Sequence, residues 1–322
     1  MDIDAIRAAA GRAEGHIPRT PMLTSPTLDA LAGRRVLVKA ECLQLTGSFK
    51  ARGGWAAVSA LDPDVRARGV IAFSSGNHAQ GVAYAARAHG VAAVIVMPQD
   101  APRAKIDGTR ALGAETVLYD RATGDRDAIG ARLAEDRGLT LIRPFDDPMT
   151  IAGQGTCGLE IAAQAAELGV TEAEVLVCCG GGGLTAGVAL ALAADAPGLR
   201  VRPVEPAGFD DVARSLVSGR IERNPALSGS VCDAIVTPQP GDLTFPILRR
   251  LCGPGLTVTD DEALRAVAIA ARHLRIVAEP GGAVALAAAL FRPDDIAGGA
   301  VVVTVSGGNI DAAMLARALM PG

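Results

Sequence analysis

The stretch VLVCCGGGGLTAGVALALAA, residues 175–194, contains the pattern that decides the fold: a short apolar run, four glycines and an Ala/Leu-rich segment. A continuous apolar run of this length is typical of a strand buried on both faces of a parallel sheet. The glycines permit a tight turn into a helix. The stretch is uncharged over 20 residues, which is long enough to span a bilayer. Four consecutive glycines would break such a helix, however, so we expect no membrane span.

Similar apolar runs recur along the chain and alternate with segments of helical period. Seven further runs are expected to be strands: residues 36–41, 70–75, 92–98, 115–120, 139–145, 200–205 and 301–306. The segments 78–90 and 260–275 are expected to be helices, and the second begins with three carboxylates, which the helix dipole favours. This alternation predicts an α/β protein with open parallel sheets.

Length, charge and cysteine usage limit the class of protein further. A chain of 322 residues is long enough for two domains. We expect residues 61–146, with four compact strand–helix units, to form a small mobile domain, and residues 1–60 and 147–322 to form a large one. A net charge of -4 without a basic stripe argues against a nucleic-acid partner. The six cysteines lack CxxC spacing, which favours free thiols in a reducing compartment and hence a cytoplasmic protein.

Three polar segments at predicted strand ends carry candidate site residues. LTGSFKARGG (45–54) places Lys50 after a turn of small residues, where partial desolvation would lower its pKa and suit it as nucleophile and base. AFSSGNHAQGVAYAA (72–86) offers backbone N–H groups to a substrate carboxylate, although it also fits a plain helix cap. VVVTVSGGNID (301–311) ends its strand in Ser306, which can hydrogen-bond a heterocycle or simply form a turn.

The glycine run from 180 to 183 is the fourth candidate segment. A strand, four glycines and a helix form a phosphate cradle, because amide donors converge on the positive end of the helix dipole. Gly181, Gly183 and Ala186 also satisfy the GxGxxA pattern, and Glu205 ends the next strand about 20 residues later. Taken alone, this segment predicts an NAD site.

Considered jointly, the Ser-Phe-Lys, Ser-Gly-Asn-His and tetraglycine motifs resemble the fold-type II pyridoxal-phosphate (PLP) enzymes, specifically the serine/threonine dehydratase (threonine ammonia-lyase) and serine racemase family. The resemblance runs in order from PRTPMLTSPTLD (18–29) to SGGNID (306–311). It implies two open parallel-sheet domains of the tryptophan synthase β type, with PLP in the cleft between them. It also removes the NAD alternative, because a dinucleotide enzyme has no use for Lys50 or Ser306 in this pattern.

The resemblance implies a role for each candidate residue. Lys50 is implied to be the Schiff-base lysine and to shuttle the substrate α-proton. The implied cofactor-binding residues are Phe49 against the ring, Asn77 at the 3′-oxygen, Gly180, Gly181, Gly182 and Gly183 at the phosphate, and Ser306 at the pyridine nitrogen. The implied substrate-carboxylate loop consists of Ser74, Ser75, Gly76 and His78. The carboxylates of Glu205 and Asp211 and the carbonyl of Phe209 are implied to bind Mg²⁺ or Ca²⁺, with a solvated acidic turn as the alternative.

The implied reaction is β-elimination from a small hydroxy-amino acid. L-Threonine or L-serine would be dehydrated and deaminated to a 2-oxo acid and ammonia, since the neutral Ser306 hydroxyl does not keep the pyridine nitrogen protonated. Phe145 favours a dehydratase, because the racemases of the family have an asparagine at this position. Ser75 keeps open a serine racemase with side dehydratase activity, because racemases of the family protonate the opposite face from a serine there. A 3-hydroxyaspartate dehydratase is a further alternative.

Three expectations complete the sequence-based interpretation. Ala234 stands where the family usually has glycine, and its methyl group is expected to narrow the pocket. Family members are commonly homodimers or homotetramers, so we expect one of these assemblies. A non-catalytic carrier of PLP or of a nucleotide is the alternative outside enzymes, and the absence of a lysine-bound cofactor would favour it.

Overall fold

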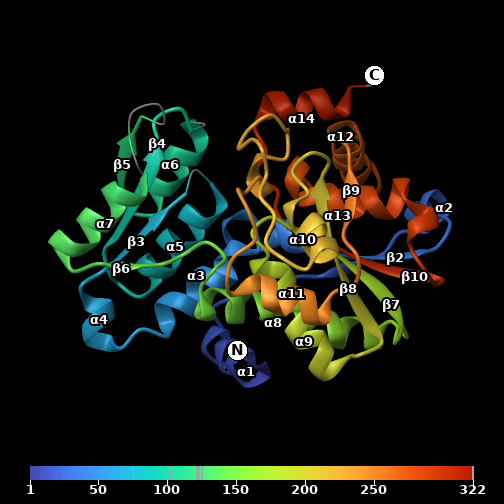
Figure 1. Ribbon diagram of the computed structural model, residues 1–322, viewed down its shortest axis with the longest axis horizontal. Coiled ribbons are helices and arrows are strands. Elements are labelled where there is room, and N and C mark those ends of the chain that lie inside the picture. Colours follow the sequence, from blue (N-terminus) through green and yellow to red (C-terminus); the bar gives the residue numbers. More distant parts are fainter. Residues whose placement is uncertain (75, 102, 121–123, 125, 321–322) are drawn as a thin grey trace.

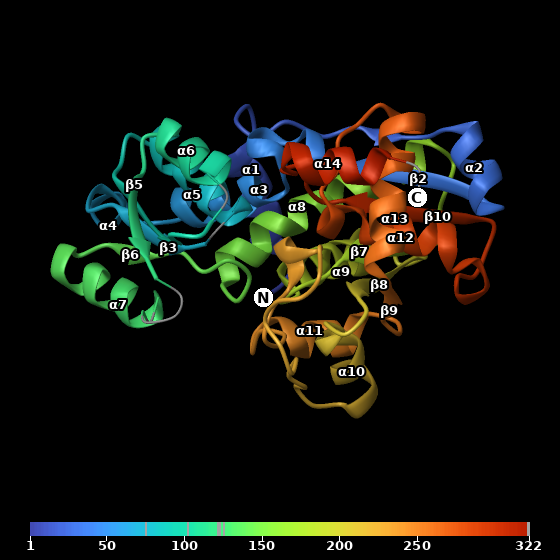
Figure 2. The same ribbon diagram turned by 90° about the horizontal axis from the view of Figure 1, so that it is seen from above.

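The computed structural model describes residues 1–320 except 75, 102, 121–123 and 125. Within these residues the chain forms two sheets, one of six strands and one of four. Figure 1 shows the four-stranded sheet and its helices on one side of the molecule and the larger sheet on the other. The second view, Figure 2, shows the same separation.

The larger sheet has apolar side chains on both faces. Its order is β1 (Met22–Leu23), β2 (Arg35–Ala40), β10 (Ala300–Val305), β7 (Ala173–Cys178), β8 (Leu199–Pro206) and β9 (Leu256–Val258). Neighbouring strands are parallel, except that β1 is antiparallel to β2. Val301 packs with α12 (Asp260–Ile269) and α13 (Pro280–Phe291), whereas Val302 packs with α8 (Pro148–Glu167) and α9 (Gly183–Asp195). Burial on both faces explains the continuous apolar runs.

The smaller sheet is parallel throughout and also lies between helices. Its order is β5 (Glu115–Tyr119), β4 (Ala93–Pro98), β3 (Val70–Phe73) and β6 (Thr140–Leu141). Ile95 packs toward α5 (Asn77–Ala88), whereas Ile71 packs toward α7 (Arg126–Arg137). Helices α4 (Pro63–Ala67) and α6 (Arg103–Ala111) complete this part.

The remaining elements connect and cover the two sheets. The helices are α1 (Ile3–Ala13), α2 (Pro26–Ala32), α3 (Lys50–Ser59), α10 (Asp211–Ser218), α11 (Thr244–Leu251) and α14 (Ala312–Leu319). The short 3-10 or π-helical segments are η1 (Glu41–Leu43), η2 (Leu45–Gly47), η3 (Asp233–Ile235), η4 (Ala270–Leu274) and η5 (Pro293–Asp295). Helix α3 lies between the two parts, because it packs against both α5 and α8. Its residues from 51 to 58 are all buried.

The structure confirms the predicted α/β class with two sheets and corrects several element boundaries. The strand expected over 139–145 is only Thr140–Leu141, because Pro144 has no N–H with which to continue the ladder. The expected helix over 260–275 is α-helical only to Ile269 and then becomes π-helical. The edge strands β1 and β9 were not predicted, and β1 makes the larger sheet mixed. The limits of 61–146 and its mobility stay predictions.

The apolar stretch around the tetraglycine is a strand, a turn and a helix, as expected. In the part of the chain that is described, no helix combines the length and hydropathy that crossing a bilayer requires.

Candidate active site

The four candidate segments meet at one cavity of about 260 Å³. Lys50 contributes from the start of α3, Asn77 from the start of α5, Gly180 from the turn after β7, and Ser306 from the end of β10. Three of these positions follow the carboxyl ends of parallel strands, where ligands bind in open α/β sheets. The cavity therefore collects the residues that the sequence placed at separate strand ends.

Lys50 presents a partly desolvated amine to the cavity. Its Nζ donates a hydrogen bond of 2.6 Å to the carbonyl oxygen of Pro144 and lies 5.0 Å from the centroid of the Phe49 ring. Burial lowers the pKa of Lys50 to about 8, so a much larger share of the amine is neutral near neutral pH than for a surface lysine. A neutral amine is the form that acts as nucleophile or base.

The tetraglycine turn has no room for side chains. A Cβ on Gly181 would overlap the Phe145 ring, and one on Gly180 would lie 2.8 Å from the Ile235 carbonyl. Gly182 has a φ of 91°, in the left-handed region that favours glycine. Among the described residues, no side chain caps the N-terminus of α9. Its free amide groups are therefore available to an anion such as a phosphate.

The Asn77 amide is held in one orientation by two partners that the sequence-based interpretation did not assign. Its Nδ2 donates to Oε1 of Glu279 at 2.6 Å, and its Oδ1 accepts from Nδ2 of Asn309 at 2.8 Å. Burial raises the pKa of Glu279, whose Oε2 is buried without a partner among the described residues. Glu279 also lines the cavity, so Asn77 and Glu279 together face whatever occupies it.

The predicted carboxylate loop is only partly described. Ser74 accepts a 3.1 Å hydrogen bond from the Gly76 amide through its Oγ, and Ser75 lies outside the described residues. His78 is buried, and its Nε2 contacts the Ile142 carbonyl at 2.9 Å. Burial and the nearby Lys50 charge lower the pKa of His78 to about 3, so this histidine is neutral and supplies no positive charge to a carboxylate. Its predicted role therefore stays a prediction.

Ser306 and Phe49 are brought together by the backbone. The Phe49 amide donates to the Ser306 carbonyl at 3.1 Å, and the Ser306 amide donates to the Gly282 carbonyl at 3.0 Å. Both side chains line the cavity, and Ser306 is 4% exposed. The two residues thus line the same cavity, and their implied roles at a cofactor ring and its nitrogen stay predictions.

Lys105 and Asp233 belong to the cavity wall but were not predicted as site residues, whereas Ala234 was expected at the pocket. Lys105 of α6, beside the smaller sheet, forms a 3.4 Å ion pair with Asp233 of η3, which belongs to the part with the larger sheet. Both residues line the cavity. Phe145 lies against the glycine turn. Ala234 also lines the cavity, so its methyl group occupies space there. No periodic pattern marks Lys105 or Asp233, because ion pairs between distant segments leave no local signature.

The candidate cation site lies apart from this cavity, at the start of α10. Glu205 accepts hydrogen bonds from the amides of Val212 at 2.9 Å and Ala213 at 2.7 Å, so it also caps that helix. Asp211 accepts from Asn224 through Oδ1, while its Oδ2 is buried without a partner in the described part of the chain. Burial raises the pKa of Asp211 to about 6, and burial together with the Asp211 charge raises the pKa of Glu205. One carboxylate oxygen is thus open to a hard cation, although the described residues contain no group of three or more His, Cys, Asp or Glu side chains that could hold a metal ion. The cation site stays a prediction.

We expect Mg²⁺ or Ca²⁺ to raise the melting temperature and EDTA to lower it. A bound cation would offset the repulsion between Glu205 and Asp211, and its stabilising effect should weaken at acid pH, because protonation of the two carboxylates competes with the cation. Asp211→Asn should remove the response to the cation, whereas Asp210→Asn, beside it, should retain it. A melting temperature that is indifferent to EDTA and to added cation would instead leave Glu205 as a helix cap alone.

Comparisons with known proteins identify the family. The family model described as "Pyridoxal-phosphate dependent enzyme" matches residues 13–308. An L-threo-3-hydroxyaspartate ammonia-lyase from Pseudomonas sp is 44% identical over 310 residues, which cover 96% of this chain and 95% of that protein. A serine racemase from Oryza sativa subsp. indica is 36% identical over 99% of this chain and 94% of its own length.

A solved structure of a related enzyme has a similar fold. The crystal structure of a threonine deaminase from T.th. has a TM-score of 0.91 and 45% identity and covers 97% of this chain and 99% of its own. The chain belongs to the family of pyridoxal-phosphate-dependent enzymes. The predicted family, fold type and cofactor are thereby confirmed. The structure fits the cofactor, because the uncapped α9 N-terminus, the glycines without space for a Cβ and the Lys50 amine face one cavity.

Proposed function

We propose that this enzyme is an ammonia-lyase that catalyses β-elimination from L-threonine or L-serine, giving a 2-oxo acid and ammonia. The observation that carries the proposal is the position of the Lys50 amine, which has a pKa of about 8 and shares a cavity with the uncapped N-terminus of α9. Bound pyridoxal phosphate supplies the electron sink for the carbanion. L-Serine would yield pyruvate, and L-threonine would yield 2-oxobutanoate.

Residues of the chain would carry out proton transfer and hold the cofactor in place. Lys50 would hold the cofactor until the substrate amine displaces it, and its freed, neutral Nζ would then take the α-proton, while the Pro144 carbonyl orients that nitrogen. The amide groups at the start of α9 would hold the phosphate. The Asn77 amide, fixed by Glu279 and Asn309, would hydrogen-bond the 3′-oxygen. Ser306 would offer a neutral hydroxyl to the ring nitrogen, which favours loss of the β-hydroxyl over long-lived charge on the ring.

A dicarboxylic substrate is a second candidate, which Lys105 supports. A relative of this chain is named L-threo-3-hydroxyaspartate ammonia-lyase, and a 3-hydroxyaspartate carries a second carboxylate. Lys105 lines the cavity with a side chain that is 14% exposed, and its partner Asp233 is 65% exposed and free to turn toward solvent. The ammonium group would then pair with the distal carboxylate.

The experiment that tests the proposal is a panel of L-serine, D-serine, L-threonine and L-threo-3-hydroxyaspartate, scored for 2-oxo acid and for chirality. Release of 2-oxo acid and ammonia from L-threonine or L-serine is the expected result. Preference for hydroxyaspartate would select the second candidate. D-Serine formed from L-serine would instead support the racemase, for which Ser75→Ala should remove racemisation and retain elimination. No product from any member of the panel would refute the proposal.

We also propose that the enzyme is a cytoplasmic homodimer or homotetramer. All six cysteines are free, and five of them are buried, which suits a reducing compartment. Size-exclusion chromatography with light scattering would measure the assembly.

A further inference from the structure

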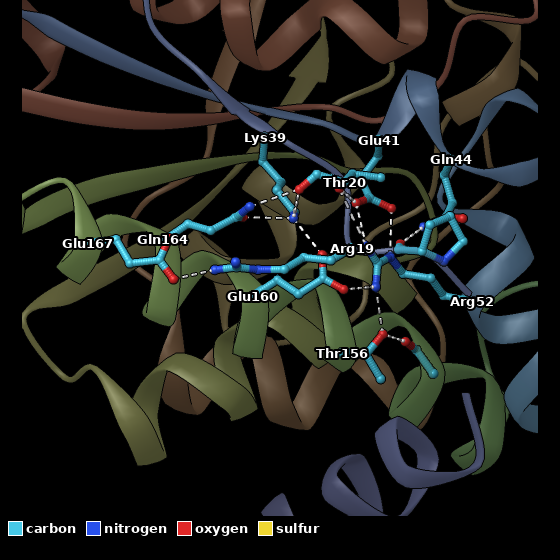
Figure 3. A network of polar contacts seen from close by, with 12 residues as sticks. Arg19, Thr20, Lys39, Glu41, Gln44, Arg52, Thr156, Glu160, Gln164 and Glu167 are labelled. Carbon is cyan, nitrogen blue, oxygen red and sulfur yellow. Dashed lines mark hydrogen bonds and ion pairs between the residues drawn. The ribbon is translucent and has the colours of Figure 1, made fainter. Parts of the chain in front are cut away.

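A network of buried charges lies behind Lys50, on the side of α3 away from the cavity. Figure 3 shows the side chains of Lys39, Glu41, Arg52 and Glu160 converging there. Arg52 follows Lys50 by two positions in α3. Because an α-helix has 3.6 residues per turn, side chains two positions apart point to nearly opposite sides. Lys50 therefore faces the cavity while Arg52 faces the interior.

Arg52 uses every donor of its guanidinium group. Nε and one terminal nitrogen bind the two oxygens of Glu41 at 2.7 and 2.8 Å. The terminal nitrogens bind the two oxygens of Glu160 at 2.7 and 2.8 Å, and Nη1 also donates to Thr156 at 3.0 Å. The guanidinium is planar with donors in a fixed fork. Two bidentate partners thus fix both its position and its plane.

Lys39 completes the network from β2. Its three donors bind Oε2 of Glu160 at 2.5 Å, Oε1 of Gln164 at 2.8 Å and the Thr20 carbonyl at 2.8 Å. The side chains of Lys39, Glu41 and Arg52 are at most 1% exposed, and that of Glu160 is 18% exposed. Two cations face two anions, so the network is neutral. Among the residues described, none of these four lines the cavity that holds Lys50.

The neighbours of α3 approach its backbone closely at glycines. A Cβ on Gly54 would lie 2.5 Å from the Gly81 carbonyl of α5, and one on Gly153 of α8 would lie 2.5 Å from the Arg52 carbonyl. A Cβ on Gly81 would lie 2.6 Å from the carbonyl oxygen of Lys50 itself. Backbone contacts this close leave little tolerance for a shift of α3, whose apolar side chains also pack against α5.

We propose that Arg52 is a positioning residue that sets the rotation and depth of α3 and thereby the place of the Lys50 amine. A buried ion pair is commonly no more stabilising than well-packed apolar side chains, so stability alone does not account for this arrangement. The ion pairs of Arg52 with Glu41 and Glu160 join the first turn of α3 to η1 and to α8. The inference rests on the proposed role of Lys50 as the lysine that bonds the cofactor.

The test uses Arg52→Lys, which keeps the charge but has three donors instead of five and cannot form the fork. A displacement of the Lys50 amine by about 1 Å is expected to lower kcat by about 100-fold. The KM should stay within about threefold, because no residue that contacts substrate has changed. The pH at which the visible absorbance of the holoenzyme titrates should also shift, since that absorbance reports the covalent bond between cofactor and lysine.

The matched control is Lys39→Met, which removes the other cation of the network but leaves both partners of Arg52 in place. It should lower the melting temperature at least as much as Arg52→Lys and leave kcat within about threefold and the absorbance titration unchanged. If Arg52→Lys does not fold, Glu41→Gln, which removes one charged partner of the fork, should show a smaller loss of the same kind.

The possible results distinguish the positioning role of Arg52 from the proposed role of Lys50 as the lysine that bonds the cofactor. Equal losses of kcat and equal titration shifts in Arg52→Lys and Lys39→Met would make the network merely structural and overturn the inference. A folded Arg52→Lys or Glu41→Gln enzyme with wild-type kcat and titration would do the same. A wild-type protein without the visible band of a lysine-bound cofactor would instead refute the assignment of Lys50.

Discussion

Lys50→Ala is expected to lower turnover by about 10⁴-fold or more, because the variant loses both the nucleophile that bonds the cofactor and the amine that moves the α-proton. The visible absorbance of the lysine-bound cofactor should disappear. The cofactor itself should still bind, more weakly, through the amides at the start of α9, so equilibrium dialysis can measure it apart from the covalent bond.

Lys105→Ala is the matched control, since Lys105 is a second lysine in the wall of the same cavity. It should retain the visible band and measurable turnover. A Lys50→Ala enzyme that kept the band, or that kept more than a tenth of the wild-type rate, would contradict the assignment.

The pKa of Lys50 predicts how bond formation and stability depend on pH. The rate at which cofactor-free protein bonds added pyridoxal phosphate should rise with pH and level off above about 8, because only the neutral amine reacts. Between pH 8 and the ordinary lysine value of 10.5 the unfolded chain binds more protons than the folded one. The stability of the cofactor-free protein attributable to Lys50 should therefore rise with pH across this window.

Gly182→Ala has the second-largest expected effect. At a φ of 91° an alanine is strained by about 1–2 kcal/mol. Its Cβ would also lie 2.8 Å from Leu248 and 2.9 Å from Thr244, and overpacking of this kind costs about 1–3 kcal/mol. Leu248 and Thr244 are fully buried, so relief of the overlap is expected to move the amide groups of α9. Affinity for pyridoxal phosphate should therefore fall about 100-fold, which corresponds to about 2.7 kcal/mol.

Gly219→Ala controls for the backbone strain alone. Gly219 ends α10 with a φ of 75°, and a Cβ there would meet no described atom within 4 Å. Urea unfolding should show a loss of about 1–2 kcal/mol in Gly219→Ala and a larger loss in Gly182→Ala, with cofactor affinity reduced only in the latter. Equal effects of the two substitutions on affinity would argue against the glycine turn as the phosphate site.

Much of the fold could be predicted because its signals are local. Parallel strands buried on both faces give continuous apolar runs, and seven of the eight expected strands lie within a few residues of their predicted positions. The eighth, expected over 139–145, was shortened by Pro144. Strands β1 and β9 have two and three residues, too few for any pattern to mark them.

The candidate site also contains residues that a local pattern marks and residues that no local pattern marks. Lys50, Asn77, the tetraglycine and Ser306 each belong to a recognisable local motif. The carboxyl ends of β7 and β10 in the larger sheet and of β3 in the smaller sheet bring three of these motifs to one cavity. Their partners follow no such rule. Asn77 meets Glu279 across 202 positions of the chain, and Lys105 meets Asp233 across 128.

The sequence by itself thus determined the alternation of strands and helices and the glycine turn after β7, and it led to the prediction of Lys50 as the cofactor-bonding lysine, because each depends on a pattern in neighbouring residues. Only the tertiary structure decided that Arg52 is clamped by Glu41 and by Glu160, the latter 108 positions away, and that Glu279 and Asn309 orient Asn77. The physical reason is that a buried ion pair or hydrogen bond between distant segments depends on the final packing of helices and sheets, which leaves no periodicity along the chain.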